Sequence, residues 1–173
     1  MNKKGKGGFT LLELMIVVGI IGVLAAISVV KFVQLIDKAK EAATKSNLGA
    51  LRSSVVIYFA DTRGIWPRKL NTETFTIGEE TFPAFIPIYI KKIPKATLQR
   101  PNPHPHTPEY EEHVEYVATE IYGEISQNQI NDSAGWIYSS TGGDVRINCN
   151  HRDSNAFNNQ NSTVYYSNYG HEF

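Results

Sequence analysis

Hydrophobic residues are concentrated near the start of the chain, in one run from Phe9 to Val30 that carries a single charge, at Glu13. The 17 residues from Leu14 to Val30 include no charged side chain at all. A helix needs about 20 apolar residues to cross the roughly 30 Å hydrocarbon core of a bilayer. The pattern therefore predicts a transmembrane helix over residues 9–30.

After this run the pattern becomes amphipathic. Apolar residues recur three and four positions apart at Leu48, Leu51, Val55 and Tyr58, and charged residues occupy other faces. This period is typical of a helix that buries one face. No proline interrupts residues 9–60, so we expect one long helix, transmembrane in its first half and amphipathic in its second. The four residues of the stripe are predicted to form the core face of a globular head.

The flanking charges predict the orientation of the transmembrane segment. Lys3, Lys4 and Lys6 precede it, whereas Lys31 alone follows directly. Positive charge is retained on the cytoplasmic side of a membrane, so the N-terminus is expected in the cytoplasm and the rest of the chain outside it.

A secretory signal peptide is an alternative interpretation of the same segment. Such a peptide combines a basic start, an apolar stretch and a small-residue cleavage site, and residues 24–26 (Leu-Ala-Ala) could supply that site. The mature protein would then begin at Ile27. Against this interpretation, the helical pattern continues beyond Ala26 without a break, which a cleaved signal does not need.

Residues 7–14 (GGFTLLEL) resemble the processing site of type IV pilins and of type II secretion pseudopilins. The similarity continues through the apolar residues up to Ile27 and through residues 50–58 and 64–67, which are similar to the end of the pseudopilin helix. It is much weaker over residues 89–94 and 135–138. In that family a prepilin peptidase cuts after the glycine and methylates the new terminal amine. The resemblance therefore implies cleavage between Gly8 and Phe9, N-methylation of Phe9, and a structural subunit that is not an enzyme.

Glu13 has two interpretations. Its carboxylate could simply be favoured by the positive end of the helix dipole. Alternatively, it could pair with the terminal amine of a neighbouring subunit, because a carboxylate at the centre of an apolar span costs about 2.5–3.5 kcal/mol. The resemblance favours the second interpretation and implies that Phe9 and Glu13 act in filament assembly.

Two features depart from the pattern of many relatives. No proline occurs near Val30, where many pilins and pseudopilins have a helix-kinking proline. Adhesive pilins commonly close a C-terminal loop with two cysteines, but Cys149 is the only cysteine of this chain. A lone cysteine cannot form that disulfide, which favours a pseudopilin-like or disulfide-free head.

The remaining residues, 61–173, predict a small exported head. Gly64 and Pro67 should end the long helix. Residues 135–138 and 145–148, separated by a Ser/Gly-rich turn, predict a β-hairpin, and residues 114–121 and 163–166 are further strand candidates. We expect an α+β fold, in which the long helix packs on a small antiparallel sheet. The predicted organisation is a leader over 1–8, the helix over 9–60 and a head over 61–173 with a variable C-terminal loop.

The head offers little candidate chemistry. No catalytic or phosphate-binding motif occurs, and the balance of 17 basic and 17 acidic residues argues against nucleic-acid binding. His104 and His106 lack a third zinc ligand. Asp132, Asp144 and Asp153 are weak calcium candidates because they are not spaced as in an EF-hand. We therefore expect no cofactor, with calcium as the one alternative.

Two hypotheses of function follow. The first is a structural subunit of a type IV pilus or a type II secretion pseudopilus, whose partners are copies of itself, prepilin peptidase and an inner-membrane assembly platform. It would sit in the inner membrane, with its head periplasmic or extracellular, before entering a filament. The alternative is a signal-anchored or secreted surface binding module that does not polymerise. The sequence leaves open whether the filament is a long pilus or a short pseudopilus.

Overall fold

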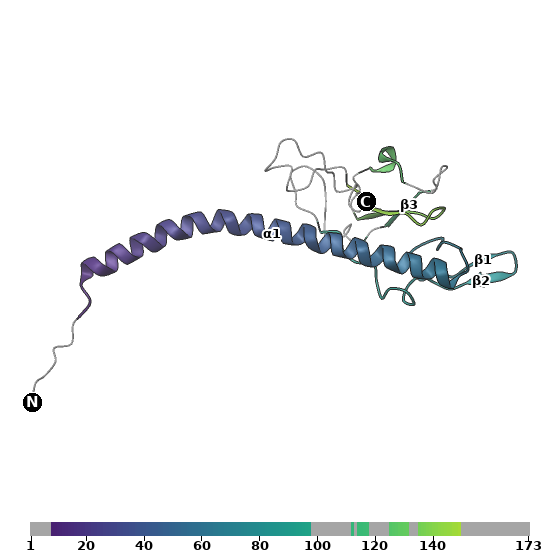
Figure 1. The fold of residues 1–173 in the computed structure, drawn as a ribbon, viewed down its shortest axis with the longest axis horizontal. Coiled ribbons are helices and arrows are strands. Elements are labelled where there is room, and N and C mark those ends of the chain that lie inside the picture. Colours follow the sequence, from purple (N-terminus) through teal and green to yellow (C-terminus); the bar gives the residue numbers. More distant parts are fainter. Residues whose placement is uncertain (1–7, 98–111, 113, 118–124, 132–134, 150–173) are drawn as a thin grey trace, which may run out of the picture. The chain divides into compact units, whose positions relative to one another are not determined.

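A computed structural model describes residues 8–97, 112, 114–117, 125–131 and 135–149 of the chain. In chain order its elements are α1 (Leu11–Asp61), β1 (Phe75–Ile77), β2 (Glu80–Phe82), β3 (Val114–Val117), a 3₁₀ turn (Gln127–Gln129), β4 (Trp136–Ser139) and β5 (Val145–Ile147) (Figure 1). The chain divides into two units, residues 1–37 and 38–173, and α1 runs through the boundary. The architecture is α+β, as the sequence predicts.

The long helix ends where its sequence predicts a stop. Thr62 N–H donates to Tyr58 O at 2.9 Å, and Gly64 N–H donates to Phe59 O at 2.8 Å. Both Arg63 and Gly64 have positive φ, of 55° and 95°. The left-handed turn therefore begins at Arg63, one residue before the expected glycine, and satisfies carbonyls that the helix end would leave without a partner.

The three-stranded sheet differs from the expectation in one pairing. β4 and β5 form the predicted antiparallel hairpin, with Trp136 opposite Ile147. β3 instead pairs with β4 in parallel, with Val114 opposite Trp136, so the sheet is mixed. Parallel neighbours need a long crossover connection, and residues 118–135 between β3 and β4 are numerous enough to provide one. The strand candidate over 163–166 lies outside the described residues.

A second, two-stranded sheet was not predicted from the sequence. β1 and β2 form an antiparallel hairpin, with Phe75 opposite Phe82 and their rings stacked at a centroid distance of 5.2 Å. The strand candidates recognised in the sequence all lie later in the chain, from residue 114 onwards. The hairpin is only three residues long on each side, so its periodicity is too short to be recognised.

The core of the head lies between the second half of α1 and the sheet. Leu48, Leu51, Val55 and Tyr58 are all buried, the last three with no exposed surface. They share one cluster with buried residues of the β4–β5 hairpin, namely Trp136, Tyr138, Val145 and Ile147. Burying a leucine- or valine-sized side chain contributes about 1.5–3 kcal/mol, so this stripe is a main source of the head's stability.

Proline carbonyl groups bind the polar atoms of the core aromatic residues. The Tyr138 hydroxyl donates to Pro67 O at 2.6 Å and the Tyr58 hydroxyl donates to Pro83 O at 3.0 Å. The indole N–H of Trp136 donates to Pro94 O at 2.7 Å. Proline lacks an N–H but keeps a full acceptor. The irregular proline-containing segments therefore satisfy groups that would otherwise be buried without partners.

The turn between β4 and β5 closes directly against Trp66. The indole stacks on Phe59 of α1 at a centroid distance of 3.9 Å. Gly143 has φ of 71°, and a Cβ atom placed on it would overlap the Trp66 ring. Glycine is thus required at position 143 both for its backbone conformation and for the close approach of the indole.

We expect Gly143→Ala to destabilise the head by about 1–3 kcal/mol, because it combines a left-handed backbone with steric overlap. Gly49→Ala is the control, since Gly49 is helical and has no neighbouring atom within 4 Å of a built Cβ. That substitution should raise stability by about 0.5–1 kcal/mol. Urea unfolding of the detergent-solubilised chain, followed by the fluorescence of Trp66 and Trp136, measures both. A Gly143→Ala variant as stable as the wild type would contradict this account of the turn.

Candidate functional site

The predicted cleavage junction lies just before α1. Gly8, Phe9 and Thr10 precede the first helical residue, and the Phe9 side chain is 80% exposed. No heavy atom lies within 4 Å of a Cβ built on Gly8. The Gly8–Phe9 peptide bond is therefore sterically open among the described residues, as a peptidase substrate must be. The three leader lysines lie outside the described residues.

Glu13 closes the first turn of α1 through a reciprocal capping arrangement. Its Oε2 atom accepts hydrogen bonds from the Thr10 backbone N–H at 2.9 Å and from the Thr10 hydroxyl at 2.8 Å. In return, the Glu13 backbone N–H donates to Thr10 Oγ1 at 3.2 Å. This is the capping box of an N-cap threonine and a glutamate three residues later, and it satisfies two N–H groups at the helix start.

Thr10 is a residue of this site that the sequence reasoning missed. The spacing Thr-x-x-Glu before an apolar run is a recognisable capping signature, so the signal was present in the sequence. All three hydrogen bonds involve Oε2 or the Thr10 hydroxyl. Within the described part of the chain Glu13 Oε1 accepts no hydrogen bond, so one carboxylate oxygen remains available for a second donor.

The first half of α1 presents a continuous apolar surface. The described large apolar side chains from Phe9 to Ile36 are all exposed, from 40% at Ile36 to 80% at Phe9. Soluble monomers rarely expose apolar patches of this extent, which mark membrane or protein contact sites. The helix is long and apolar enough to cross a membrane, and none of its most apolar window is buried in the chain. It is therefore compatible with a transmembrane anchor.

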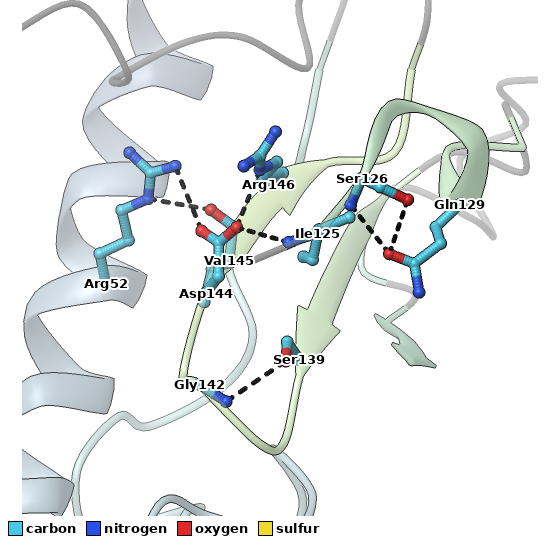
Figure 2. Close-up of polar contacts among 9 residues, drawn as sticks. All are labelled: Arg52, Ile125, Ser126, Gln129, Ser139, Gly142, Asp144, Val145 and Arg146. Carbon is cyan, nitrogen blue, oxygen red and sulfur yellow. Dashed lines mark hydrogen bonds and ion pairs between the residues drawn. The ribbon is translucent and has the colours of Figure 1, made fainter. Parts of the chain in front are cut away.

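In the head, Asp144 is the centre of a polar cluster (Figure 2). Its Oδ2 atom accepts from Arg146 Nε at 2.8 Å and from the backbone N–H of Ile125 at 3.1 Å. On the other side, Arg52 Nη2 lies 3.9 Å from Asp144 Oδ1, and Arg52 Nε donates to Val145 O at 2.9 Å. One carboxylate thus joins α1, β5 and the segment before the 3₁₀ turn.

This environment makes Asp144 a poor calcium ligand, because two guanidinium groups already neutralise its charge. Burial lowers the pKa of Arg52, and the Asp144 carboxylate opposes that shift. The other calcium candidates, Asp132 and Asp153, lie outside the described residues, as do His104 and His106. Within the described ranges no three His, Cys, Asp or Glu residues are grouped so that they could hold a metal ion.

A second polar cluster, also missed from the sequence, joins β3 to the residues after β5. Asn148 is fully buried, and its Nδ2 atom donates to Glu115 Oε2 at 2.8 Å and to Asn131 Oδ1 at 2.9 Å. Asn131 Nδ2 donates to the other oxygen of Glu115 at 2.7 Å. The cluster holds the parallel strand in place. Its members are 16 to 33 residues apart, so no local motif could have revealed it.

We expect Asp144→Asn to destabilise the head by about 1–3 kcal/mol, because Arg52 Nη2 is buried without a hydrogen-bond partner and would lose its counter-charge. Glu73→Gln is the control, since Glu73 forms a surface ion pair with Lys69 at 3.4 Å and is 66% exposed. Such pairs contribute less than about 1 kcal/mol. Chemical denaturation of both variants measures the difference, and equal stability would contradict the structural role of Asp144.

Comparison with known families gives one result for the N-terminal region. Residues 3–29 match the family model described as the prokaryotic N-terminal methylation motif. Comparison with curated proteins and with solved structures gave no match. The matched segment contains Gly8, Phe9, Thr10 and Glu13 and ends within the exposed apolar half of α1. The chain therefore carries the prepilin-like signature of type IV pilins and pseudopilins, followed by a long apolar helix and an α+β head.

Proposed function

We propose that the chain is the precursor of a filament subunit. Prepilin peptidase removes residues 1–8 and methylates the amine of Phe9, and the mature subunits polymerise through the first half of α1. The observation that carries this proposal is that the methylation motif and an exposed apolar helix surface are adjacent in the chain. The methylation motif leads directly into a helix surface that is exposed along its length and that no described part of the chain covers.

Before assembly, lipid covers this surface. The subunit is held in the inner membrane by residues 9–30, with the basic leader in the cytoplasm and the head on the periplasmic side. Residue 13 is the only charged position within the span. Its carboxylate is unfavourable in hydrocarbon, and the capping box reduces that cost by supplying two hydrogen bonds from Thr10. An assembly platform in the same membrane then delivers the subunit to the filament.

During assembly, the same carboxylate gains a charged partner. Cleavage creates a positive amine on Phe9, about one helical turn before Glu13. The capping box occupies Glu13 Oε2 and leaves Oε1 open, so the amine of a neighbouring subunit could donate to Oε1 without breaking the cap. Opposite charges attract most strongly where water is excluded, as between packed apolar helices. The pair would therefore favour the filament over the membrane-held monomer and set its axial register.

The composition of the head supports a structural role in a disulfide-free subunit, because Cys149 is the only cysteine of the sequence. Cys149 is buried in the same core cluster as Ile147, a position that suits packing. No enzymatic activity, cofactor or nucleic acid is needed for the proposed function. These features favour a pseudopilin-like subunit over an adhesive pilin with a C-terminal disulfide loop.

The alternative function is an anchored binding module that uses α1 only to hold its head at the membrane. Such a module needs the apolar span but does not need a charge at Glu13 or a cut between Gly8 and Phe9. The two functions therefore differ in what happens when the charge at residue 13 is removed.

We expect Glu13→Gln to be cleaved normally but to lower filament yield about tenfold or more. Glutamine can keep the capping hydrogen bonds and the shape of the side chain, and it loses only the charge. Glu13→Leu should fail in the same way. Thr10→Val is the matched control, because it removes the Thr10 hydroxyl from the cap and keeps the charge, and it should assemble nearly as well as the wild type.

Processing is measured by the intact mass of each variant, and filament yield by electron microscopy of sheared cells. Abundant filaments from correctly processed Glu13→Gln would reject the charge pair and leave Glu13 a capping role alone. A wild-type protein that is present in the membrane, with its assembly machinery, but never forms filaments would favour the anchored binding module.

A further inference from the structure

The β1–β2 hairpin presents a small acidic surface at its tip, which we call the acidic patch: Ile77, Glu79 and Glu80. Ile77 is 55% exposed, and both glutamates are exposed. Ile77 and Glu80 face each other across the hairpin, and the turn between them passes through Gly78 with φ of 63°. Neither glutamate side chain forms an ion pair or a hydrogen bond with another described residue, so both charges face solvent.

The base of this hairpin is firmly held, so the position of its tip is defined. Phe82 is buried, and its ring stacks on that of Phe75. The next residue, Pro83, accepts the hydrogen bond of the Tyr58 hydroxyl from α1. In Figure 1 the hairpin extends past the C-terminal end of α1.

A second surface of the head has the same make-up and the opposite charge. This basic patch consists of Ile88, Lys91 and Lys92. Ile88 is 63% exposed, Lys91 is exposed, and the Lys92 side chain is 75% exposed. Among the residues that the structure describes, Lys92 has one long ionic contact, at 3.9 Å to Glu112, and Lys91 has no ion pair.

The basic patch lies beside α1, before the end of the helix. The Tyr89 hydroxyl donates to Asp61 Oδ2 at 2.5 Å, and Asn47 Nδ2 donates to Lys95 O at 2.8 Å. The segment between these anchors therefore runs back along the helix, from its last residue towards Asn47. Lys91 and Lys92 lie within this stretch. The two patches are thus at different heights along the direction of α1, and no described contact joins them.

We propose that these two patches bind each other between successive copies of this chain, an inference that rests on the proposed filament function. Subunits that share one helix direction are displaced along it, so the acidic patch at the top of one head reaches the basic patch on the side of the next. An interface between two different surfaces of the same molecule does not close on itself unless rotation makes a ring, and otherwise generates a helical filament.

The chemistry of the patches suits a register-setting contact. Each offers one exposed isoleucine to bury and two like charges to pair with the opposite sign. Charges at the rim of an interface mainly steer association and exclude wrong registers, and salt screens them. Polymerisation would thus depend on α1 for affinity, while the patches would select which neighbour each head contacts.

Cysteine cross-linking tests the contact directly in assembled filaments. A double variant, Glu79→Cys with Lys91→Cys, should form a ladder of covalent multimers on oxidation, because each subunit can bond to one neighbour above and another below. Each single variant should give dimers at most. Glu73→Cys with Lys91→Cys is the matched control, since Glu73 is exposed but lies outside the acidic patch, and it should give no ladder.

Charge reversal gives a second, independent readout. Glu79→Lys/Glu80→Lys and Lys91→Glu/Lys92→Glu should each lower filament yield about tenfold, because like charges then face each other. The quadruple variant restores opposite charges and should recover the yield. If wild-type filaments form but no ladder appears and the reversals assemble normally, the patch contact is wrong and the filament function stands. If the wild type forms no filaments, both the patch contact and the proposed filament function are wrong.

Discussion

The apolar surface that runs from Phe9 through the first half of α1 to Ile36 has to be covered. Apolar surface in water costs about 25 cal/mol per Å², and the side chains along this stretch are 40–80% exposed. No described residue of the chain covers them. Lipid or other apolar helices can do so. In the proposed function, the surface contacts lipid before assembly and the helices of neighbouring subunits after it.

The second half of α1 differs from the first, because one of its faces is buried in the core of the same chain. Leu51, Val55 and Tyr58 lie in the core, while Arg52 reaches Asp144 at the edge of the sheet. This half of the helix therefore belongs to the head, and the unit that contains the sheets begins at Lys38. A single helix thus combines an exposed apolar surface with the central element of a folded head.

Local sequence signals predicted the parts of the fold that depend on local physics. The long helix, its stop near Gly64 and the β4–β5 hairpin all follow from periodicity and turn residues close together in the chain. The capping box of Thr10 and Glu13 is equally local and could have been recognised.

The parallel pairing of β3 could not have been predicted in this way, because it depends on a crossover and on Glu115 binding Asn148, 33 residues away. The hydrogen bond from Arg52 Nε to Val145 O, beside Asp144, joins residues 93 positions apart in the sequence, so no local pattern predicts it.

The mass of the N-terminal peptide of the protein, isolated from cells that also contain a prepilin peptidase, tests the central claim most directly. In the proposed function, removal of the leader leads from the membrane-held form to the filament form, because it creates the amine that Glu13 is proposed to bind. The account predicts a peptide that begins at Phe9 and carries one additional methyl group on its amine. A protein that begins at Ile27, or one that keeps its leader and is fully assembled, would contradict the account.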